Sequence, residues 1–205
     1  MRDRWQESDV PRGAAYDLRF EDLASTGMDM HGEAALVDSY GPGSVLDAGC
    51  GTGRVAIELS RRGHAVVGVD VDVAMLEAAR AKAPELAWVR GDLADPLLDL
   101  GRTFDVVVMA GNVLIFVPSG SEEQVIANAA RWLNPGGLFV TGYSLAPDGF
   151  GPERHDLMAS RSGLVLQDRW STWDGRRFSP RDGYAVSVHR RQAAPLPADA
   201  TEKQR

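Results

Sequence analysis

The sequence predicts an α/β domain with a mostly parallel seven-stranded sheet, helices on both faces and an antiparallel hairpin at the C-terminal end. Three observations lead to this fold class. From Ser44 onward, short β-branched runs alternate with helical patterns. The first five strand-like runs are apolar almost throughout, as in parallel sheets that are covered on both faces. The last two runs, 164–173 and 184–190, are joined only by the polar segment 174–183, which predicts a hairpin.

The individual elements follow from local patterns. A first helix should end near Gly63, and a second should follow a cap at Asp72 and end before Pro84. A third should begin at Ser121, which with Gln124 three residues later fits the pattern of a capping box. The strands of the parallel part are expected over 44–48, 65–70, 86–90, 104–110 and 137–145.

Length and composition indicate one folded domain. We expect a helical segment over 1–40, the sheet domain over 41–192 and a disordered tail over 193–205. The net charge of -7 argues against nucleic acid as a partner. The single cysteine and four scattered histidines argue against a disulfide or a metal site. The sequence shows no secretory signal and no apolar run long enough to span a bilayer. We therefore expect a cytoplasmic protein without a membrane partner, of unspecified oligomeric state.

The stretch 45–54, VLDAGCGTGR, carries the clearest chemical signal. A buried strand leads into a turn with three alternating glycines, and a helix begins at once. The loop reads G-x-G-x-G, and Arg54 occupies the place of the last glycine of the dinucleotide fingerprint. Asp47, two residues before the first glycine, would repel a pyrophosphate but suits an ammonium and a sulfonium. S-adenosylmethionine (S-adenosyl-L-methionine) is a ligand with both groups.

Five motifs, in order, resemble those of the class I S-adenosylmethionine-dependent methyltransferases. The motifs are residues 46–53, 68–71, 90–93, 104–112 and 133–140, the last of which matches the L-x-P-G-G entry to the fifth strand. The resemblance covers roughly residues 40 to 190. Each motif alone is weak, whereas five in register are specific. The resemblance implies a Rossmann-like fold and an enzyme that transfers a methyl group from S-adenosylmethionine.

Carried over by position, the resemblance implies a binding site for the methionine part of the cofactor. The backbone of Gly49, Cys50 and Gly51 would hold it, with Asp47 near its ammonium and the hydroxyl of Tyr16 at its carboxylate. Asp47 has an alternative role as a cap for the following helix. Cys50 is interpreted as a packing residue rather than a nucleophile.

The resemblance also implies a nucleoside site. Asp70 would accept hydrogen bonds from both ribose hydroxyls, because a carboxylate has two suitably spaced oxygens. Val71 and Leu93 would enclose the adenine, and Asp92 would accept its amino group. As an alternative, Asp92 is a turn residue.

The acceptor is expected to be a small molecule. Ala110 and Asn112 would form the floor beneath the sulfonium. The sequence there is AGNV and not the Asn/Asp-Pro-Pro-aromatic motif, which resembles that of enzymes that methylate amino groups of nucleic acids and some proteins. The segment 16–33 resembles a mobile lid. Within it, His31 is the candidate general base because its unperturbed pKa is closest to neutral, with Glu33 as an alternative. As an alternative, His31 simply flanks the start of a helix.

Two further side chains and two rival functions complete the expectations. Tyr143 and His155, just beyond the fifth strand, are additional pocket candidates. A NAD(P)-dependent oxidoreductase would use a similar strand order but is disfavoured by Asp47 and the missing glycine. A catalytically silent cofactor-binding module is the second alternative.

Overall fold

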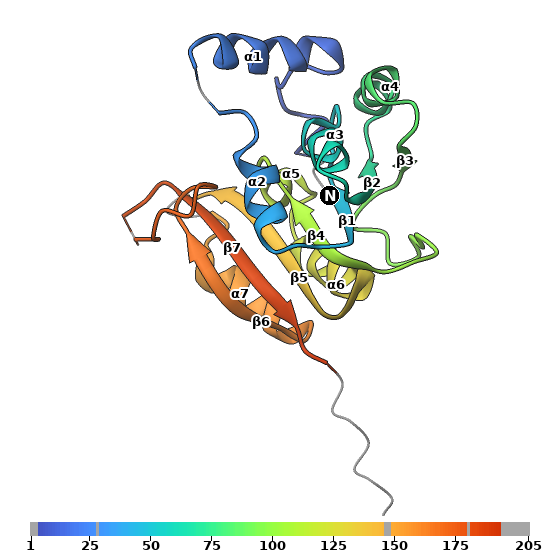
Figure 1. The fold of residues 1–205 in the computed structure, drawn as a ribbon. Coiled ribbons are helices and arrows are strands. Elements are labelled where there is room, and N and C mark those ends of the chain that lie inside the picture. Colours follow the sequence, from blue (N-terminus) through green and yellow to red (C-terminus); the bar gives the residue numbers. More distant parts are fainter. Residues whose placement is uncertain (1–3, 28, 146–148, 180, 194–205) are drawn as a thin grey trace, which may run out of the picture.

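In a computed structural model, the chain is described over residues 4–27, 29–145, 149–179 and 181–193. These residues form a single seven-stranded sheet of order β3-β2-β1-β4-β5-β7-β6 (Figure 1). The strands are β1 (Ser44–Ala48), β2 (Ala65–Asp70), β3 (Ala87–Arg90), β4 (Phe104–Met109), β5 (Leu133–Ser144), β6 (Leu164–Trp170) and β7 (Tyr184–Arg191). The helices are α1 (Ala14–Ser25), α2 (Gly32–Ser39), α3 (Arg54–Arg61), α4 (Val73–Lys82), α5 (Val113–Phe116), α6 (Glu122–Trp132) and α7 (Pro152–Arg161).

The pairing of the strands confirms the predicted fold class. Strands β1 to β5 run parallel to one another, whereas β7 is antiparallel to both β5 and β6. The predicted C-terminal hairpin is thus β6–β7, and it forms the end of the sheet beyond β5. A parallel order that runs outward in both directions from β1 and β4 leaves a crevice at the carboxyl ends of these two strands.

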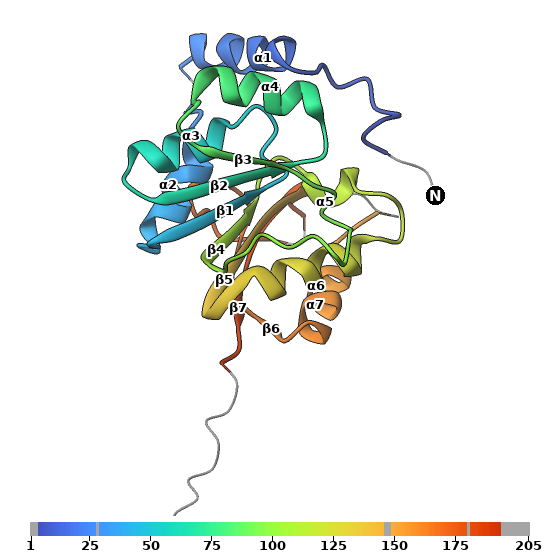
Figure 2. The same cartoon turned by 90° about the vertical axis from the view of Figure 1, so that its right-hand side faces the viewer.

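Helices cover both faces of the sheet (Figure 2). Successive side chains of a strand point to opposite faces, so each strand contributes to two cores. On one face, Val45, Val106 and Val108 pack with apolar residues of α2, α3 and α4. On the other, Leu46 and Val107 pack with residues of α6 and α7. Because both faces are buried, the central strands are apolar at nearly every position.

Of the two predicted helix caps, one is confirmed and one is wrong. The Asp72 side chain accepts hydrogen bonds from the backbone N–H groups of Ala74 and Met75, at the start of α4. Ser121 makes no such bond, because its hydroxyl donates to the carbonyl of Pro118 at 2.7 Å. The carboxylate of Glu122 accepts from the backbone N–H of Gly120 instead.

Several boundaries differ from those expected. Strand β5 begins at Leu133 rather than at residue 137, because Leu133 already pairs with Phe104 ahead of an irregularity in the ladder. The apolar run after β4 turns into the short helix α5, and α7 separates β5 from β6. Apart from Ala193, the expected tail lies outside the described residues. No helix in the described ranges is both long and apolar enough to cross a membrane.

Candidate active site

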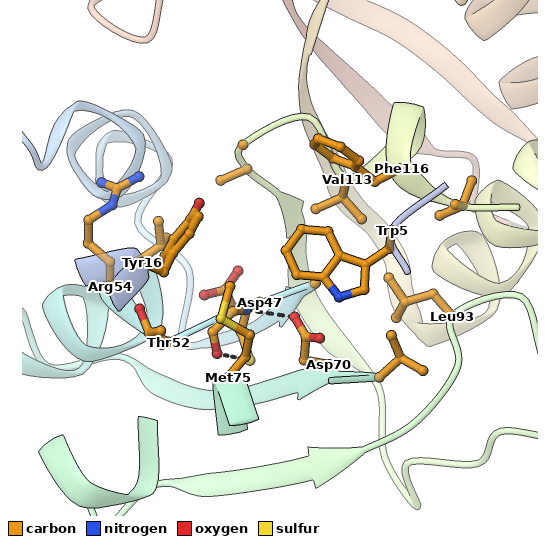
Figure 3. A pocket seen from close by; sticks show the side chains of 18 of the residues that line it. Trp5, Tyr16, Asp47, Thr52, Arg54, Asp70, Met75, Leu93, Val113 and Phe116 are labelled. Atoms are coloured by element: carbon orange, nitrogen blue, oxygen red, sulfur yellow. Dashed lines mark hydrogen bonds between the residues drawn. The ribbon is translucent and has the colours of Figure 1, made fainter. Parts of the chain in front are cut away.

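A cavity of about 230 Å³ opens at the carboxyl ends of β1, β2 and β4. Its walls come from the loop after β1, the ends of β2 and β3, the segment after β4, and the N-terminal residues before β1 (Figure 3). The cavity therefore lies at the point where the strand order reverses, which is where ligands of open α/β sheets bind.

The glycine-rich loop is shaped by its neighbours. Gly49 has a φ of 78°, and a Cβ at this position would lie 2.6 Å from the side chain of Val113. The backbone N–H groups of Gly49 and Cys50 donate to the carbonyl of Val69. Gly51 donates to a carboxylate oxygen of Asp70 at 2.8 Å. The backbone N–H groups of Gly49, Cys50 and Gly51 therefore already have acceptors within the protein, and the loop packs closely against Val113.

Asp47 lines the cavity and also caps α3, so both roles considered for it are combined. Only 2% of the residue is exposed, and one carboxylate oxygen accepts the backbone N–H of Ala56 at 3.0 Å. Burial raises the pKa of Asp47 to about 7. Because a carboxylate occupies the start of α3, this helix end favours a cationic ligand group over an anionic one.

Asp70 lies at the end of β2 and faces the same cavity. Its two oxygens accept the backbone N–H groups of Gly51 and Asp72 at 2.8 and 2.9 Å. Burial raises its pKa, although hydrogen bonds from the backbone of Asp72, Gly51 and Val71 act in the opposite direction. A carboxylate has about four lone-pair sites, so it can still accept a hydrogen bond from a ligand.

The other predicted nucleoside residues also line the cavity. Val71, Asp92 and Leu93 are among its walls. Asp92 accepts the backbone N–H of Ala94 at 2.9 Å, so the turn role considered for it is present as well. Cys50 is buried, and burial raises the pKa of its thiol well above the usual value. A thiol held in its protonated form is a poor nucleophile.

The two residues expected to form the floor behave differently. Ala110 lines the cavity, together with Gly111. Asn112 is not among the lining residues. Its side-chain oxygen accepts the backbone N–H of Ser144 at 2.7 Å, and its φ of 71° places it in the left-handed region. In the structure Asn112 therefore joins β5 to the start of α5 instead of facing a ligand.

The candidate residues of the N-terminal segment also differ in their position relative to the cavity. Tyr16 and Glu33 line the cavity, whereas His31 does not. His31 occupies the residue before α2, and its Nδ1 lies 3.8 Å from a carboxylate oxygen of Glu58. This is the helix-start position considered as its alternative, and it does not support a role as general base.

Tyr143 and His155 lie outside the cavity. Both side chains are fully buried between β5 and α7, where they contact each other and Phe150. The prediction that they belong to the pocket is wrong, because the side chain of Tyr143 points to the face of the sheet covered by α7.

Sequence reasoning missed a group of mostly apolar wall residues. They are Trp5, Phe20, Thr52, Val55, Met75, Val113, Phe116, Val117 and Pro118. Most come from segments that carry no motif, so only the tertiary fold brings them to the cavity. It also missed Arg54, which was noted only as the replacement of a glycine.

The charges of the cavity suit a cation. Asp47, Asp70 and Asp92 contribute three carboxylates. Glu33 binds both terminal nitrogens of the Arg54 guanidinium, so these two charges largely offset each other. Arg54 is the only cationic side chain among the described lining residues. This group of carboxylates fits the sulfonium and ammonium of S-adenosylmethionine, and it disfavours a pyrophosphate.

Comparisons with known proteins agree with this geometry. A family model described as a methyltransferase domain matches residues 45–137. A TehB-like S-adenosylmethionine-dependent methyltransferase from Corynebacterium glutamicum is 36% identical, with a TM-score of 0.79 over 87% of this chain and 97% of that chain. An uncharacterized methyltransferase from Mycobacterium sp. (strain JLS) is 30% identical over 196 residues, 91% of this chain and 72% of the relative.

Other curated relatives are longer than this chain. A dTDP-3-amino-3,4,6-trideoxy-alpha-D-glucopyranose N,N-dimethyltransferase from Streptomyces venezuelae is 31% identical over 139 residues, 64% of this chain and 56% of the relative. For two further methyltransferases, the matched region spans 33% and 50% of the relative's length.

Proposed function

Because the chain belongs to the class I S-adenosylmethionine-dependent methyltransferases, we propose that it transfers a methyl group from S-adenosylmethionine to a small-molecule acceptor. The buried carboxylates of Asp47 and Asp70, on either side of the glycine-rich loop, carry this proposal. They give the cavity the negative charge that a sulfonium cofactor requires. When bound, the cofactor supplies an activated methyl group, so the protein must mainly bind, align and exclude water.

The nucleoside end of the cavity is assigned to four residues. Asp70 accepts the ribose hydroxyls through the lone pairs that Gly51 and the backbone of Asp72 leave free. Val71 and Leu93 enclose the adenine, and Asp92 accepts its amino group. All four side chains belong to residues that line one cavity, which supports these assignments.

The methionine end is assigned to Asp47 and Arg54. Asp47 pairs with the ammonium, and the raised pKa of its carboxyl means that a nearby cation favours its ionised form. Arg54 pairs with the carboxylate, since its planar guanidinium has five donors and Glu33 with the carbonyl of Met30 takes three of them. Tyr16, another lining residue, flanks the same end.

The remaining walls are assigned to the acceptor. Phe20, Val113, Phe116, Val117 and Pro118 are apolar and line the cavity. Walls of this kind exclude water from the reacting atoms and hold an acceptor by its apolar surface. Relatives that methylate amino sugars attached to a nucleotide support the choice of a small molecule.

Calorimetry with purified protein tests the proposal. S-adenosylhomocysteine should bind with a dissociation constant in the micromolar range, about -8 kcal/mol, and NAD and NADP should bind far more weakly. Transfer of a labelled methyl group to a panel of small amines, thiols and phenols then identifies the acceptor class. Binding of nicotinamide dinucleotides as tightly as S-adenosylhomocysteine would refute the proposal.

A further inference from the structure

Trp5 is a wall of the cavity that comes from outside every motif. It precedes α1 in the sequence, yet its side chain lines the cavity together with Asp70 and Leu93. In Figure 3 the indole is drawn between Phe116 and Asp70. Trp5 belongs to none of the helices or strands, so its position in the cavity needs specific contacts.

Three contacts hold the indole. Its Nε1 donates to a carboxylate oxygen of Asp72 at 2.9 Å. The guanidinium carbon of Arg12 lies 3.7 Å from the ring centroid, and Arg12 forms an ion pair with the same oxygen of Asp72 at 3.0 Å. The ring of Phe116 meets the indole edge to face, with centroids 5.5 Å apart. Asp72 directly follows Val71, so the indole is tied to the end of β2.

The residue before Trp5 is anchored on the other side of the cavity. Arg4 donates to the hydroxyl of Ser119 at 2.9 Å and to the carbonyl of Ile115 at 3.3 Å. The segment from Arg4 to Arg12 therefore crosses from the region of α5 to the start of α4. These polar contacts offset part of the entropy lost when this segment is ordered.

We propose that Trp5 is a nucleoside-binding residue, whose indole packs against the adenosine part of the cofactor. One ring face is occupied by Arg12 and the N–H by Asp72. Phe116 packs against the ring as well, and Trp5 lines the cavity together with Asp70, Val71 and Leu93, the residues assigned to ribose and adenine. Stacking of an indole on a nucleic-acid base changes affinity by roughly five- to hundredfold. Arg12 and Asp72 act as positioning residues. This inference rests on the proposed function, because that function places adenosine at this end.

Two ligands and two variants test the inference. S-adenosylhomocysteine and 5′-methylthioadenosine share the nucleoside, but only the first carries the amino acid part. In Trp5→Ala, both ligands should bind about tenfold more weakly than to the wild-type protein, because the lost contact is to the nucleoside. Trp5→Phe, which keeps an aromatic ring, should recover part of the affinity. Trp170→Ala is the matched control, since Trp170 is half-buried on β6 and is not a wall of the cavity.

The positioning role of Arg12 has a separate readout. Ligand binding should change the emission of Trp5, measured as the difference between wild-type and Trp5→Phe protein. Arg12→Ala should reduce this difference and weaken both ligands, and Arg12→Lys, which keeps a cation near the ring, should restore part of each. An Arg12 that merely stabilised the fold would lower the thermal midpoint without altering the spectral change.

Three results with the Trp5→Ala variant would overturn the inference while leaving the proposed function in place. Unchanged affinities in Trp5→Ala would show that the indole does not contact the ligand. Tighter binding would show that Trp5 occupies the nucleoside site and blocks it. Loss of affinity for S-adenosylhomocysteine alone would place Trp5 at the amino acid end. If the wild-type protein bound neither ligand, the proposed function would fail together with this inference.

Discussion

Asp47 illustrates how one residue serves the fold and the cofactor at once. Its carboxylate caps α3 through the N–H of Ala56, yet burial makes its ionised form costly, and its pKa is raised to about 7. An unfolded chain would lose this proton near pH 4. Between about pH 4 and 7 the native state therefore holds a proton that the unfolded state has lost, and stability falls as pH rises through this window.

The substitution Asp47→Asn should remove this pH dependence. The amide oxygen can still accept the N–H of Ala56, but the side chain has no charge to bury. Both proteins are compared without ligand. As pH rises from 5 to 8, the free energy of unfolding of the variant should increase relative to that of wild type by at least about 1 kcal/mol, which corresponds to roughly 2–4 °C in the unfolding midpoint. Thermal unfolding at both pH values measures the difference. If the stability of the two proteins changed equally with pH, Asp47 would be ionised throughout this range.

Arg54 is the residue with which we test the methionine end. The double variant Arg54→Met/Glu33→Gln is the form to measure, because it leaves no unpaired buried charge. Loss of a charge-assisted contact should make S-adenosylhomocysteine bind to this variant roughly tenfold or more weakly than to the wild-type protein. 5′-Methylthioadenosine, which has no carboxylate, should bind equally well to the variant and to the wild-type protein. Glu33→Gln alone keeps Arg54 and separates the effect of losing Glu33 from that of losing the guanidinium. Equal loss for the two ligands would mean that Arg54 only supports the local structure.

At the scale of elements, the turn between β1 and α3 depends on a close approach to β3. Gly53 has a φ of 84°, and a Cβ there would lie 2.4 Å from the indole of Trp88. Gly63, just beyond α3, has a φ of 97° but open space around the position of its missing Cβ. The two glycines share the requirement for a left-handed backbone, and only Gly53 adds a steric one.

Alanine at these two positions should therefore have different costs. Gly63→Ala should lower the free energy of unfolding by about 1–2 kcal/mol, the cost of a left-handed backbone with a Cβ. Gly53→Ala should cost about 1–3 kcal/mol more, because the added methyl group overpacks against Trp88. Urea unfolding of both variants measures the difference. Equal losses would show that Trp88 moves aside without cost.

Elements whose identity depends on local pattern were predictable from the sequence. The central parallel strands were predictable because strands buried on both faces are continuous apolar runs. The β6–β7 hairpin was predictable for a different reason, because only a polar segment joins its two strand-like runs. The capping box at Ser121 failed although its pattern was correct. Ser121 has a helical backbone conformation, with φ and ψ of -94° and -2°, so its hydroxyl bonds backward to Pro118. Helix α5 was missed because VLIF continues an apolar run that sequence alone does not divide.

At the scale of the whole molecule, the site combines a predictable part with an unpredictable one. Residues of the glycine-rich loop and of the strand ends line the cavity as expected, since the strand order places them together. Trp5 and Asp72 are 67 positions apart, and no local pattern couples them. His31 was chosen for the unperturbed pKa of its side chain and Asn112 by analogy with a family, and in this chain other contacts direct both side chains elsewhere.

Differences in burial also predict which parts of the molecule open most easily. No described side chain of α1 is buried. Asp17 of this helix contacts the hydroxyl of Thr52 and the ammonium of Lys82, and the guanidinium of Arg54 lies over the ring of Phe20. A helix with so little buried apolar surface opens locally at a low free-energy cost. The central strands of the sheet are buried on both faces, so we expect them to open only with global unfolding.

Hydrogen exchange with and without S-adenosylhomocysteine should therefore reveal coupling between the N-terminal segment and the cofactor. Protection should rise in the loop 47–53 and also over residues 4–25 and 29–33, because Trp5, Tyr16 and Glu33 belong to the same cavity walls. Strands β4 and β5, already protected in the free protein, should change little. A response confined to 47–53 would show that the N-terminal segment does not close over the cofactor. Trp5 and Tyr16 would then lose their proposed roles, whereas Asp47 and Asp70 would keep theirs, since they lie on the rigid sheet.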